Sequence, residues 1–230
     1  MKITKTNRNL LIGLLLGDGT ISNNNVFKLA HSSKQSEYLQ WKISILNNNG
    51  IKNNGMHTYT SSCGYNKTKE VVYTQLKITP FIKVLRRVFY KPTKIIGNRK
   101  MLNRLSPQEI AIWYMDDGTI NYRITKKRNK IHGFYIRIST CVPKQEAQVI
   151  VDYFKEVWNI KFYLFHEGSK KDSYSLCCGT QEGIKFINLV SPTVSQVPSM
   201  KYKITYDLSQ RVRNNFCSAS ETGDALSVKI

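Results

Sequence analysis

The chain has 230 residues, of which 41% are hydrophobic and 11% aromatic, enough to bury the core of one large domain or two small ones and to exclude general disorder. Its 35 lysines and arginines against 15 aspartates and glutamates give a net charge of +20, which is typical of proteins that bind a polyanion. Nucleic acid is the first candidate, ahead of an anionic membrane surface or a basic ribosome-bound protein.

Cysteine and histidine patterns exclude two further classes of protein. The five cysteines are odd in number and irregularly spaced, and the four histidines lie far apart. Neither a disulfide framework nor a zinc knuckle is therefore indicated, and we expect a reducing, intracellular compartment. No segment approaches the ~18–20 apolar residues of a membrane span, so we expect a soluble chain without a membrane partner. Leu10–Leu16 is too short, and too poorly flanked, for a signal peptide.

The first half begins with an apolar helical run that ends in an acidic turn. Leu10–Ile21 reads LLIGLLLGDGTI, in which a helical pattern gives way to Gly-Asp-Gly and a β-prone pair. Thr79 and Pro80 later mark a helix start, with threonine as N-cap and proline in the first turn. The other expected elements are, in order, strands with a turn at Thr20–His31, a helix at Gln35–Asn47, strands at Met56–Ser61 and Val71–Ile78, and a helix at Phe81–Tyr90.

The second half repeats this order about 100 residues later, the sign of an internal duplication. Glu109–Ile120 reads EIAIWYMDDGTI, again an apolar helix followed by Asp-Gly-Thr-Ile. The elements expected after it are strands at Ile120–Thr125 and Phe134–Thr140 around the basic loop Lys126–Lys130, a helix from Pro143 to Trp158, strands at Lys161–Phe165 and Tyr174–Cys178, and a short helix at Gly183–Val190.

Each half therefore reads αββαββα, which predicts an α+β fold of two pseudo-symmetric halves. We expect an N-terminal half at residues 1–93, a linker at 94–105 and a C-terminal half at 106–208. The tail at residues 209–230 has few large apolar residues, so we expect it to be poorly packed.

The two repeated aspartates suit metal-assisted chemistry. Gly13 and Gly17 lie on one helical face and would let a second helix approach closely, with Ala111 as the small residue opposite them. If the two helices pack in the same direction, Asp18 and Asp117 meet at their ends. Two close carboxylates repel unless a cation lies between them, and oxygen ligands suit Mg²⁺, which can assist phosphodiester hydrolysis. One such turn alone is usually structural; two equivalent copies favour a functional pair.

These segments resemble the signature of a known family. LIGLLLGDG (Leu11–Gly19) and IAIWYMDDG (Ile110–Gly118) are similar to the nine-residue motif of the LAGLIDADG homing endonucleases, in the single-chain form with two motifs. The second motif with the residues before it, LSPQEIAIWYMDDG (Leu105–Gly118), looks especially like the yeast mitochondrial intron-encoded type. The resemblance covers roughly Leu10–Ile204 and implies a monomer whose halves, each with a four-stranded antiparallel sheet, pack through the motif helices. It implies cleavage of both strands of a long, asymmetric site in double-stranded DNA.

The resemblance also implies the roles of the site residues. Asp18 and Asp117 match the acidic metal ligands of the family, and their neighbours Gly17 and Asp116 fall at the same metal site. Mg²⁺ is the expected ion; Mn²⁺ is expected to substitute for it, and Ca²⁺ to bind without supporting cleavage. The basic residues that the family places near the scissile phosphates align with Lys94 and Lys203. A further polar position of the family falls near His31–Ser32 and Thr140–Cys141.

Polar residues on the exposed faces of the strands are candidates for contact with DNA. Phe134, Ile136 and Ile138 alternate with polar neighbours, which is typical of a sheet with one buried face. Arginine, lysine, asparagine and glutamine are the side chains that read base edges. The candidate readers are Asn23, Asn25, Lys28, Gln75, Lys77, Tyr122, Arg123, Lys126 and Arg137. The run Lys126, Lys127 and Arg128 is better suited to phosphate contacts, which position a protein without specifying sequence.

Three other functions compete with the nuclease. An intron RNA maturase, a catalytically inactive DNA-binding protein on the same scaffold and an unrelated basic RNA-binding protein would each use the same positive charge. The presence of both aspartates and both candidate lysines argues against the inactive form, and the repeated Asp-Gly-Thr-Ile argues against the unrelated protein. The abundance of Asn, Lys, Ile and Tyr suits an A/T-rich gene, such as one in a mitochondrion or another organelle.

Overall fold

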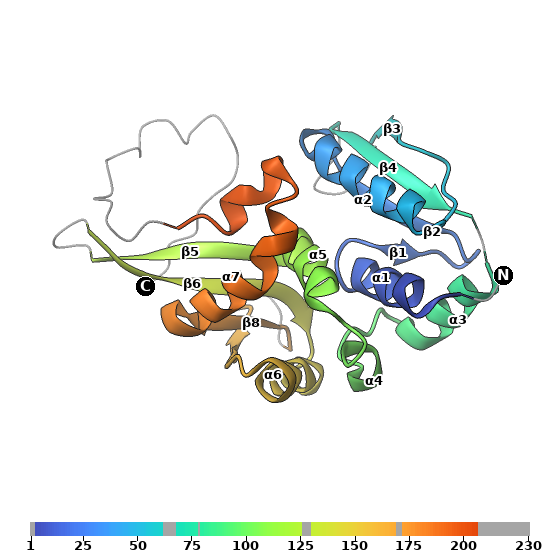
Figure 1. Cartoon of the computed structure of the whole chain (residues 1–230). Coiled ribbons are helices and arrows are strands. Elements are labelled where there is room, and N and C mark those ends of the chain that lie inside the picture. The colour runs from blue at the N-terminus through green and yellow to red at the C-terminus, as the bar shows by residue number, and fades with distance from the viewer. Residues whose placement is uncertain (1–2, 62–67, 78, 126–129, 169–171, 207–230) are drawn as a thin grey trace.

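The computed structural model describes residues 3–61, 68–77, 79–125, 130–168 and 172–206. It contains two halves, each with helices packed on a four-stranded antiparallel sheet (Figure 1). The halves meet through the central helices α1 and α5, which lie side by side in the middle of the molecule. The predicted α+β class, with two antiparallel sheets joined through the motif helices, is confirmed.

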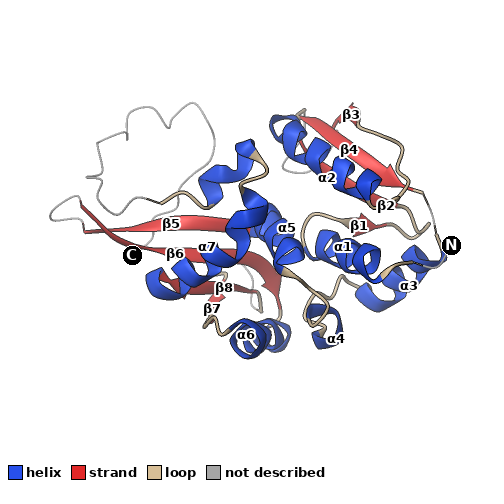
Figure 2. Cartoon of the chain, viewed as in Figure 1, coloured by secondary structure: helices blue, strands red, loops and turns tan. Residues whose placement is uncertain are grey.

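The N-terminal half follows the expected order of helices and strands (Figure 2). Its elements are α1 (Lys5–Leu16), β1 (Thr20–Ile21), β2 (Phe27–Ser32), a 3-10 helix (Ser33–Gln35), α2 (Ser36–Asn48), β3 (His57–Thr60), β4 (Glu70–Leu76) and α3 (Pro80–Phe89). The side chain of Thr79 accepts a hydrogen bond from the N–H of Ile82, and Pro80 is in the first turn of α3. The helix start expected from the sequence is therefore confirmed.

The C-terminal half repeats this arrangement, with a longer first hairpin and longer helices after it. Its elements are α5 (Pro107–Asp117), β5 (Gly118–Thr125), β6 (Lys130–Val142), α6 (Lys144–Trp158), β7 (Tyr163–His166), β8 (Tyr174–Gly179), α7 (Thr180–Val194) and a 3-10 helix (Pro198–Lys203). Helix α7 exceeds the predicted Gly183–Val190, because apolar residues on its inner face continue to Val194. Between the halves, the expected linker contains a short helix, α4 (Arg99–Leu102).

The two sheets have matching strand orders, β1-β2-β4-β3 and β5-β6-β8-β7. Along β2, Phe27, Leu29 and His31 are buried while Lys28 and Ala30 are partly exposed, so successive side chains alternate between two faces. Helix α2 packs on β2 and β4, and α6 and α7 pack on β6 and β8. Each sheet therefore has one face against helices and one face free for contact with another molecule.

Close contacts between α1 and α5 fix the relation of the two halves. A Cβ atom on Gly13 would lie 2.6 Å from the Cβ of Glu109, and one on Gly17 would lie 2.6 Å from the Cβ of Asp116. Because both glycines meet residues in the same order along the partner helix, the helices run in the same direction, as predicted. The residues nearest to the glycines are Glu109 and Asp116, so the prediction that Ala111 packs against them was wrong.

Candidate active site at the ends of the motif helices

The turn after α1 presents Asp18 at the surface. The N–H of Gly19 donates to the carbonyl of Leu14 over 2.9 Å, and a Cβ atom on Gly19 would lie only 2.3 Å from that oxygen. Only glycine therefore permits this tight ending. The Asp18 side chain is 42% exposed, which leaves its carboxylate accessible to a ligand.

Asp116, the residue before the second motif aspartate, faces the first half of the molecule. Its side chain is completely buried and receives the Lys42 ammonium at 2.6 Å and the Tyr38 hydroxyl at 2.9 Å on one carboxylate oxygen. Its other carboxylate oxygen accepts the backbone N–H of Asp18 over 3.0 Å. Asp116 thus connects the end of α5 to α2 and to the end of α1.

His31 joins the same network from the end of β2. Its Nδ1 atom lies 3.3 Å from a carboxylate oxygen of Asp18, and its Nε2 atom lies 3.1 Å from the Lys42 ammonium. A neutral ring with its proton on Nδ1 donates to Asp18 and accepts from Lys42. The polar position expected near His31 is therefore next to the first motif aspartate, although its role was not assigned from the sequence.

The two lysines singled out in the sequence both reach the motif ends. Lys94 donates to the carbonyl oxygens of Gly17 and Gly19 over 2.7 and 3.1 Å. Lys203 donates to the carbonyl of Met115 over 2.6 Å and lies 3.5 Å from that of Asp116. Each motif end thus has its own lysine, in related positions on the two sides of the pseudo-symmetric site.

Burial and opposing charges shift the pKa values of these groups. Burial raises the pKa of Asp117 to about 7, and the nearby carboxylates of Asp18 and Asp116 raise it in the same direction. Burial would also raise the pKa of Asp18, but the hydrogen bond from His31 and the positive charges around it hold that pKa below its ordinary value. Burial lowers the pKa values of Lys94 and Lys203, while the three aspartates oppose the change. The carboxylates are therefore close enough to repel one another.

The donor set fits a hard divalent cation at Asp18 and Asp117. Carboxylate and backbone carbonyl oxygens are the ligands that Mg²⁺ prefers, and a cation between two repelling carboxylates would relieve the repulsion. The carboxylate of Asp116 fits less well, because both of its oxygens already accept hydrogen bonds. Ligand atoms of Asp18, His31 and Asp116 lie within 4.8 Å of one another, but the adjacent Lys42 ammonium would repel a cation there.

The exposed face of the N-terminal sheet carries some of the candidate DNA contacts. Lys28 and Gln75 are directly opposite each other on β2 and β4. The Lys28 ammonium lies 4.4 Å from the ring centre of Tyr59 and 4.5 Å from that of Tyr73, which orients it by cation–π contact. Of the remaining candidates in this half, Arg86 donates to the side chain of Asn23, Asn25 is in a turn with a φ of 59°, and Lys77 is exposed after β4.

The exposed face of the C-terminal sheet orients a second basic side chain. Arg137 on β6 forms an ion pair with Glu167, and its guanidinium lies 4.7 Å from the ring centre of Phe165. Arg123 is exposed on β5. The neighbouring Tyr122 lies on the other face of the strand, where its side chain is also exposed and its hydroxyl donates to the carbonyl of Thr205 over 3.4 Å. Candidates Lys126, Lys127 and Arg128 lie outside the described residues.

The sequence matches the model of the LAGLIDADG DNA endonuclease family over residues 8–186, which is more than half of the chain and includes both motifs. The chain belongs to this family. The resemblance drawn from the two motifs is therefore confirmed.

Two curated relatives carry different names and are covered to different extents. The LAGLIDADG chain is 30% identical over 205 residues to protein RecA of Mycobacterium shimoidei, covering 85% of this chain and 45% of that one, so it spans less than half of the RecA relative. It is 23% identical over 214 residues to the probable intron-encoded endonuclease 1 of Wickerhamomyces canadensis, covering 90% and 87% of the two chains.

A solved structure shows the same fold. The homing endonuclease I-WcaI, in a structure bound to its DNA recognition sequence, superposes with a TM-score of 0.72 at 19% sequence identity. The alignment covers 90% of this chain and 89% of I-WcaI. In the described part of the LAGLIDADG chain, no helix is both long and apolar enough to traverse a lipid bilayer.

Lys42 is the site residue that the sequence reasoning missed. It lies on the inward face of α2 together with Tyr38, Leu39, Ile43 and Leu46, all of them buried. A lysine at a position where the helical pattern requires an apolar residue is itself a signal, because a buried charge needs a partner. That signal was available in the sequence, but the partner, Asp116, is 74 residues away.

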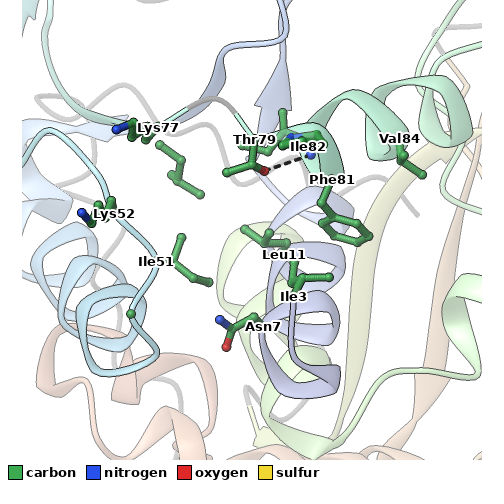
Figure 3. A pocket seen from close by; sticks show the side chains of 13 residues that line it. Ile3, Asn7, Leu11, Ile51, Lys52, Lys77, Thr79, Phe81, Ile82 and Val84 are labelled. Carbon is green, nitrogen blue, oxygen red and sulfur yellow. Dashed lines mark hydrogen bonds between the residues drawn. The ribbon is translucent and has the colours of Figure 1, made fainter. Parts of the chain in front are cut away.

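A cavity of about 520 Å³ lies at the other end of α1, away from the motif aspartates (Figure 3). Its walls are mostly apolar and include Leu11, Ile51 and Phe81, with Lys52 and Lys77 also among the lining residues. The described residues that line it include no carboxylate to serve as a metal ligand or general base, so this cavity is not the candidate active site.

Proposed function

We propose that this protein is a site-specific endonuclease that hydrolyses both strands of double-stranded DNA with divalent metal ions. The observation that carries the proposal is the close approach of α1 and α5, which end just before Asp18 and at Asp117, with the Asp18 N–H bonded to Asp116 and a lysine at each end. Two related sets of groups suit two chemically identical cuts. The family of the chain and its fold support the same conclusion.

Asp18 and Asp117 would hold the metal, together with the carbonyl oxygens of Gly17 and Asp116. Bound Mg²⁺ supplies positive charge for the phosphate and lowers the pKa of a coordinated water. Lys94 and Lys203 place an ammonium group beside each motif end, where it can stabilise negative charge that develops on a phosphate. Asp116 contributes through its carbonyl, because its carboxylate is engaged with Lys42 and Tyr38.

The two exposed sheet faces supply the proposed DNA-binding surface. Gln75 on one sheet, and Arg123 and Arg137 on the other, are base-reading side chain types on exposed strand faces, and Lys28 adds a positive charge opposite Gln75. Because the halves differ in sequence, the site that they read is asymmetric. Both motifs are in one chain, so a monomer suffices. The related I-WcaI was solved bound to its DNA recognition sequence, which supports double-stranded DNA as the partner.

The test is a cleavage selection on a plasmid library of genomic inserts with Mg²⁺, followed by sequencing of the new ends. We expect double-strand breaks at one long site, Mn²⁺ in place of Mg²⁺ to support them, and Ca²⁺ to support binding alone. Asp18→Asn and Asp117→Asn are each expected to reduce cleavage at least about 10³-fold while DNA binding persists. Asp152→Asn on α6, away from the motif ends, is the matched control and is expected to cleave normally.

The contrary outcome is equally definite. If the wild-type protein cuts no DNA with any of these ions but binds a structured intron RNA tightly, the nuclease proposal is wrong and the maturase function replaces it. If either aspartate variant cuts as fast as the wild type, that residue is not a metal ligand.

A further inference from the structure

The network around Asp116 supports one motif aspartate and not the other. Asp116 reaches across the interface and accepts the backbone N–H of Asp18 over 3.0 Å. The position equivalent to Asp116 in the first motif is Gly17, which has no side chain to return such a bond to Asp117. Among the described residues, therefore, only the first motif aspartate has its backbone held by a carboxylate from the opposite half.

Lys42 determines where the Asp116 carboxylate lies. Both side chains are completely buried, and their 2.6 Å ion pair joins α2 of the N-terminal half to α5 of the C-terminal half. Without Lys42, a buried carboxylate would lack its counter-charge and would repel both Asp18 and Asp117. Lys42 also reaches Asp18 by a second route, since its ammonium lies 3.1 Å from Nε2 of His31, whose Nδ1 contacts Asp18.

The second half has no similar group on the corresponding helix. Ile150 occupies the position in α6 that Lys42 occupies in α2, counted from the start of each helix, and it is completely buried. The buried face of α6 consists of Ala147, Ile150, Val151, Tyr153 and Phe154, so it presents no charge to the end of α1 or α5.

We propose that Lys42 is a positioning residue that holds Asp18 for cleavage through Asp116 and His31, and that this support serves one of the two strand cuts more than the other. The inference rests on the proposed nuclease function for its kinetic consequence. Its structural consequence, the holding of the Asp18 backbone by Asp116, is independent of any activity.

The first measurement follows the hydrogen bond itself in the metal-free protein. In Lys42→Met, hydrogen–deuterium exchange at the Asp18 amide is expected to be about 10-fold faster or more, because the carboxylate that accepts this N–H loses its anchor. Ile43→Met, a substitution of a buried apolar residue on the same helix that keeps the ion pair of Lys42, is the matched control and should leave that exchange unchanged.

The second measurement follows each DNA strand separately under single-turnover conditions, on the site recovered from the plasmid selection. Lys42→Met is expected to slow the cutting of one strand about 10- to 100-fold through misplacement of Asp18, with an effect below about threefold on the other. A purely structural role would lower the active fraction of protein and leave the ratio of the two single-turnover rates unchanged.

A double variant keeps the proposal testable if Lys42→Met alone does not fold. Lys42→Met with Asp116→Leu removes both buried charges, so it should fold, and it should still lose the Asp18 amide protection and show the same strand bias. Equal slowing of both strands, unchanged exchange at Asp18, or wild-type behaviour of the double variant would each overturn the proposal. If the wild type cuts nothing, the proposed function fails, while the exchange measurement still decides whether Lys42 positions Asp18.

Discussion

The two motif helices end in the same Asp-Gly-Thr-Ile sequence, but the two halves surround these ends differently. In the first half, α2 directs Lys42 and Tyr38 towards the interface, and they hold Asp116 of the opposite motif. In the second half, α6 presents an apolar face with Ile150 at the corresponding position. Under the proposed function, the comparison suggests a simple rule: the carboxylates and their lysines are repeated in both halves, while the packing beneath them differs.

The largest expected effect comes from breaking the charge pair that distinguishes the halves. Asp116→Leu leaves Lys42 buried without its counter-charge and is expected to lower the free energy of unfolding by about 3–5 kcal/mol. Adding Lys42→Met should restore most of that loss, because no uncompensated charge remains. Urea unfolding of both single variants and the double variant measures the interaction energy between Lys42 and Asp116. If the losses of the two single variants add up in the double variant, the two residues do not stabilise the fold as a pair.

A smaller loss is expected where Asp116 packs against α1. In Gly17→Ala, the added Cβ atom would lie 2.1 Å from a carboxylate oxygen of Asp116, which cannot move away from Lys42 and Tyr38. We expect a loss of about 1–3 kcal/mol in unfolding free energy. Gly168→Ala, where a Cβ atom would meet nothing within 4 Å, is the control and should change stability by no more than about 0.5 kcal/mol. Equal effects at both glycines would contradict the close approach.

The exposed sheet faces offer a comparison of DNA recognition. Arg137 is oriented by Glu167 and Phe165, and a guanidinium with a fixed orientation suits the proposed contact with one base edge. Arg137→Met is therefore expected to relax the preference for one base pair of the target by about 1–3 kcal/mol. Cleavage of a set of single-base target variants measures this; an unchanged preference at every position would exclude Arg137 as a base reader.

Lys28 should have the smallest and least specific effect. Its ammonium lies over the rings of Tyr59 and Tyr73, and no carboxylate in the described part of the chain forms an ion pair with it, so it acts as a point charge. Lys28→Met is expected to weaken binding similarly for all target variants and to reduce the slope of affinity against salt concentration by about one. Binding measured over a series of salt concentrations tests this, and a base-specific change with an unchanged slope would show direct readout instead.

Local sequence patterns predicted most of the fold. The threonine and proline at the start of α3 predicted its first turn, because capping depends only on neighbours in the chain. The duplicated motifs predicted the parallel helices and the meeting of their ends. The prediction that Ala111 packs against Gly13 was wrong, since the structure places Glu109 there. Helical spacing indicates which face of a helix packs, but it does not give the axial offset between two helices.

The site was predicted where its residues lie in or near the motifs, and missed where they come from elsewhere. Asp18 and Asp117 follow from the repeat, and Lys94 and Lys203 from the family resemblance; the structure places both lysines at the motif ends. The sequence reasoning placed Asp116 at the metal site, but its carboxylate is bound to a lysine 74 residues away. Pairings over such separations depend on tertiary geometry that no local pattern encodes.

The ion pair between Lys42 and Asp116 also limits how the two halves can be recombined. A symmetric dimer of N-terminal halves would bury two lysines with no acid between them, and a dimer of C-terminal halves would bury two aspartates without a base. A chimaera that takes one half from a relative must therefore carry a matching residue at position 42 or 116. The pair thus determines which halves can assemble. Transferring residues 42 and 116 together from the same relative is the simplest way to build hybrids that assemble.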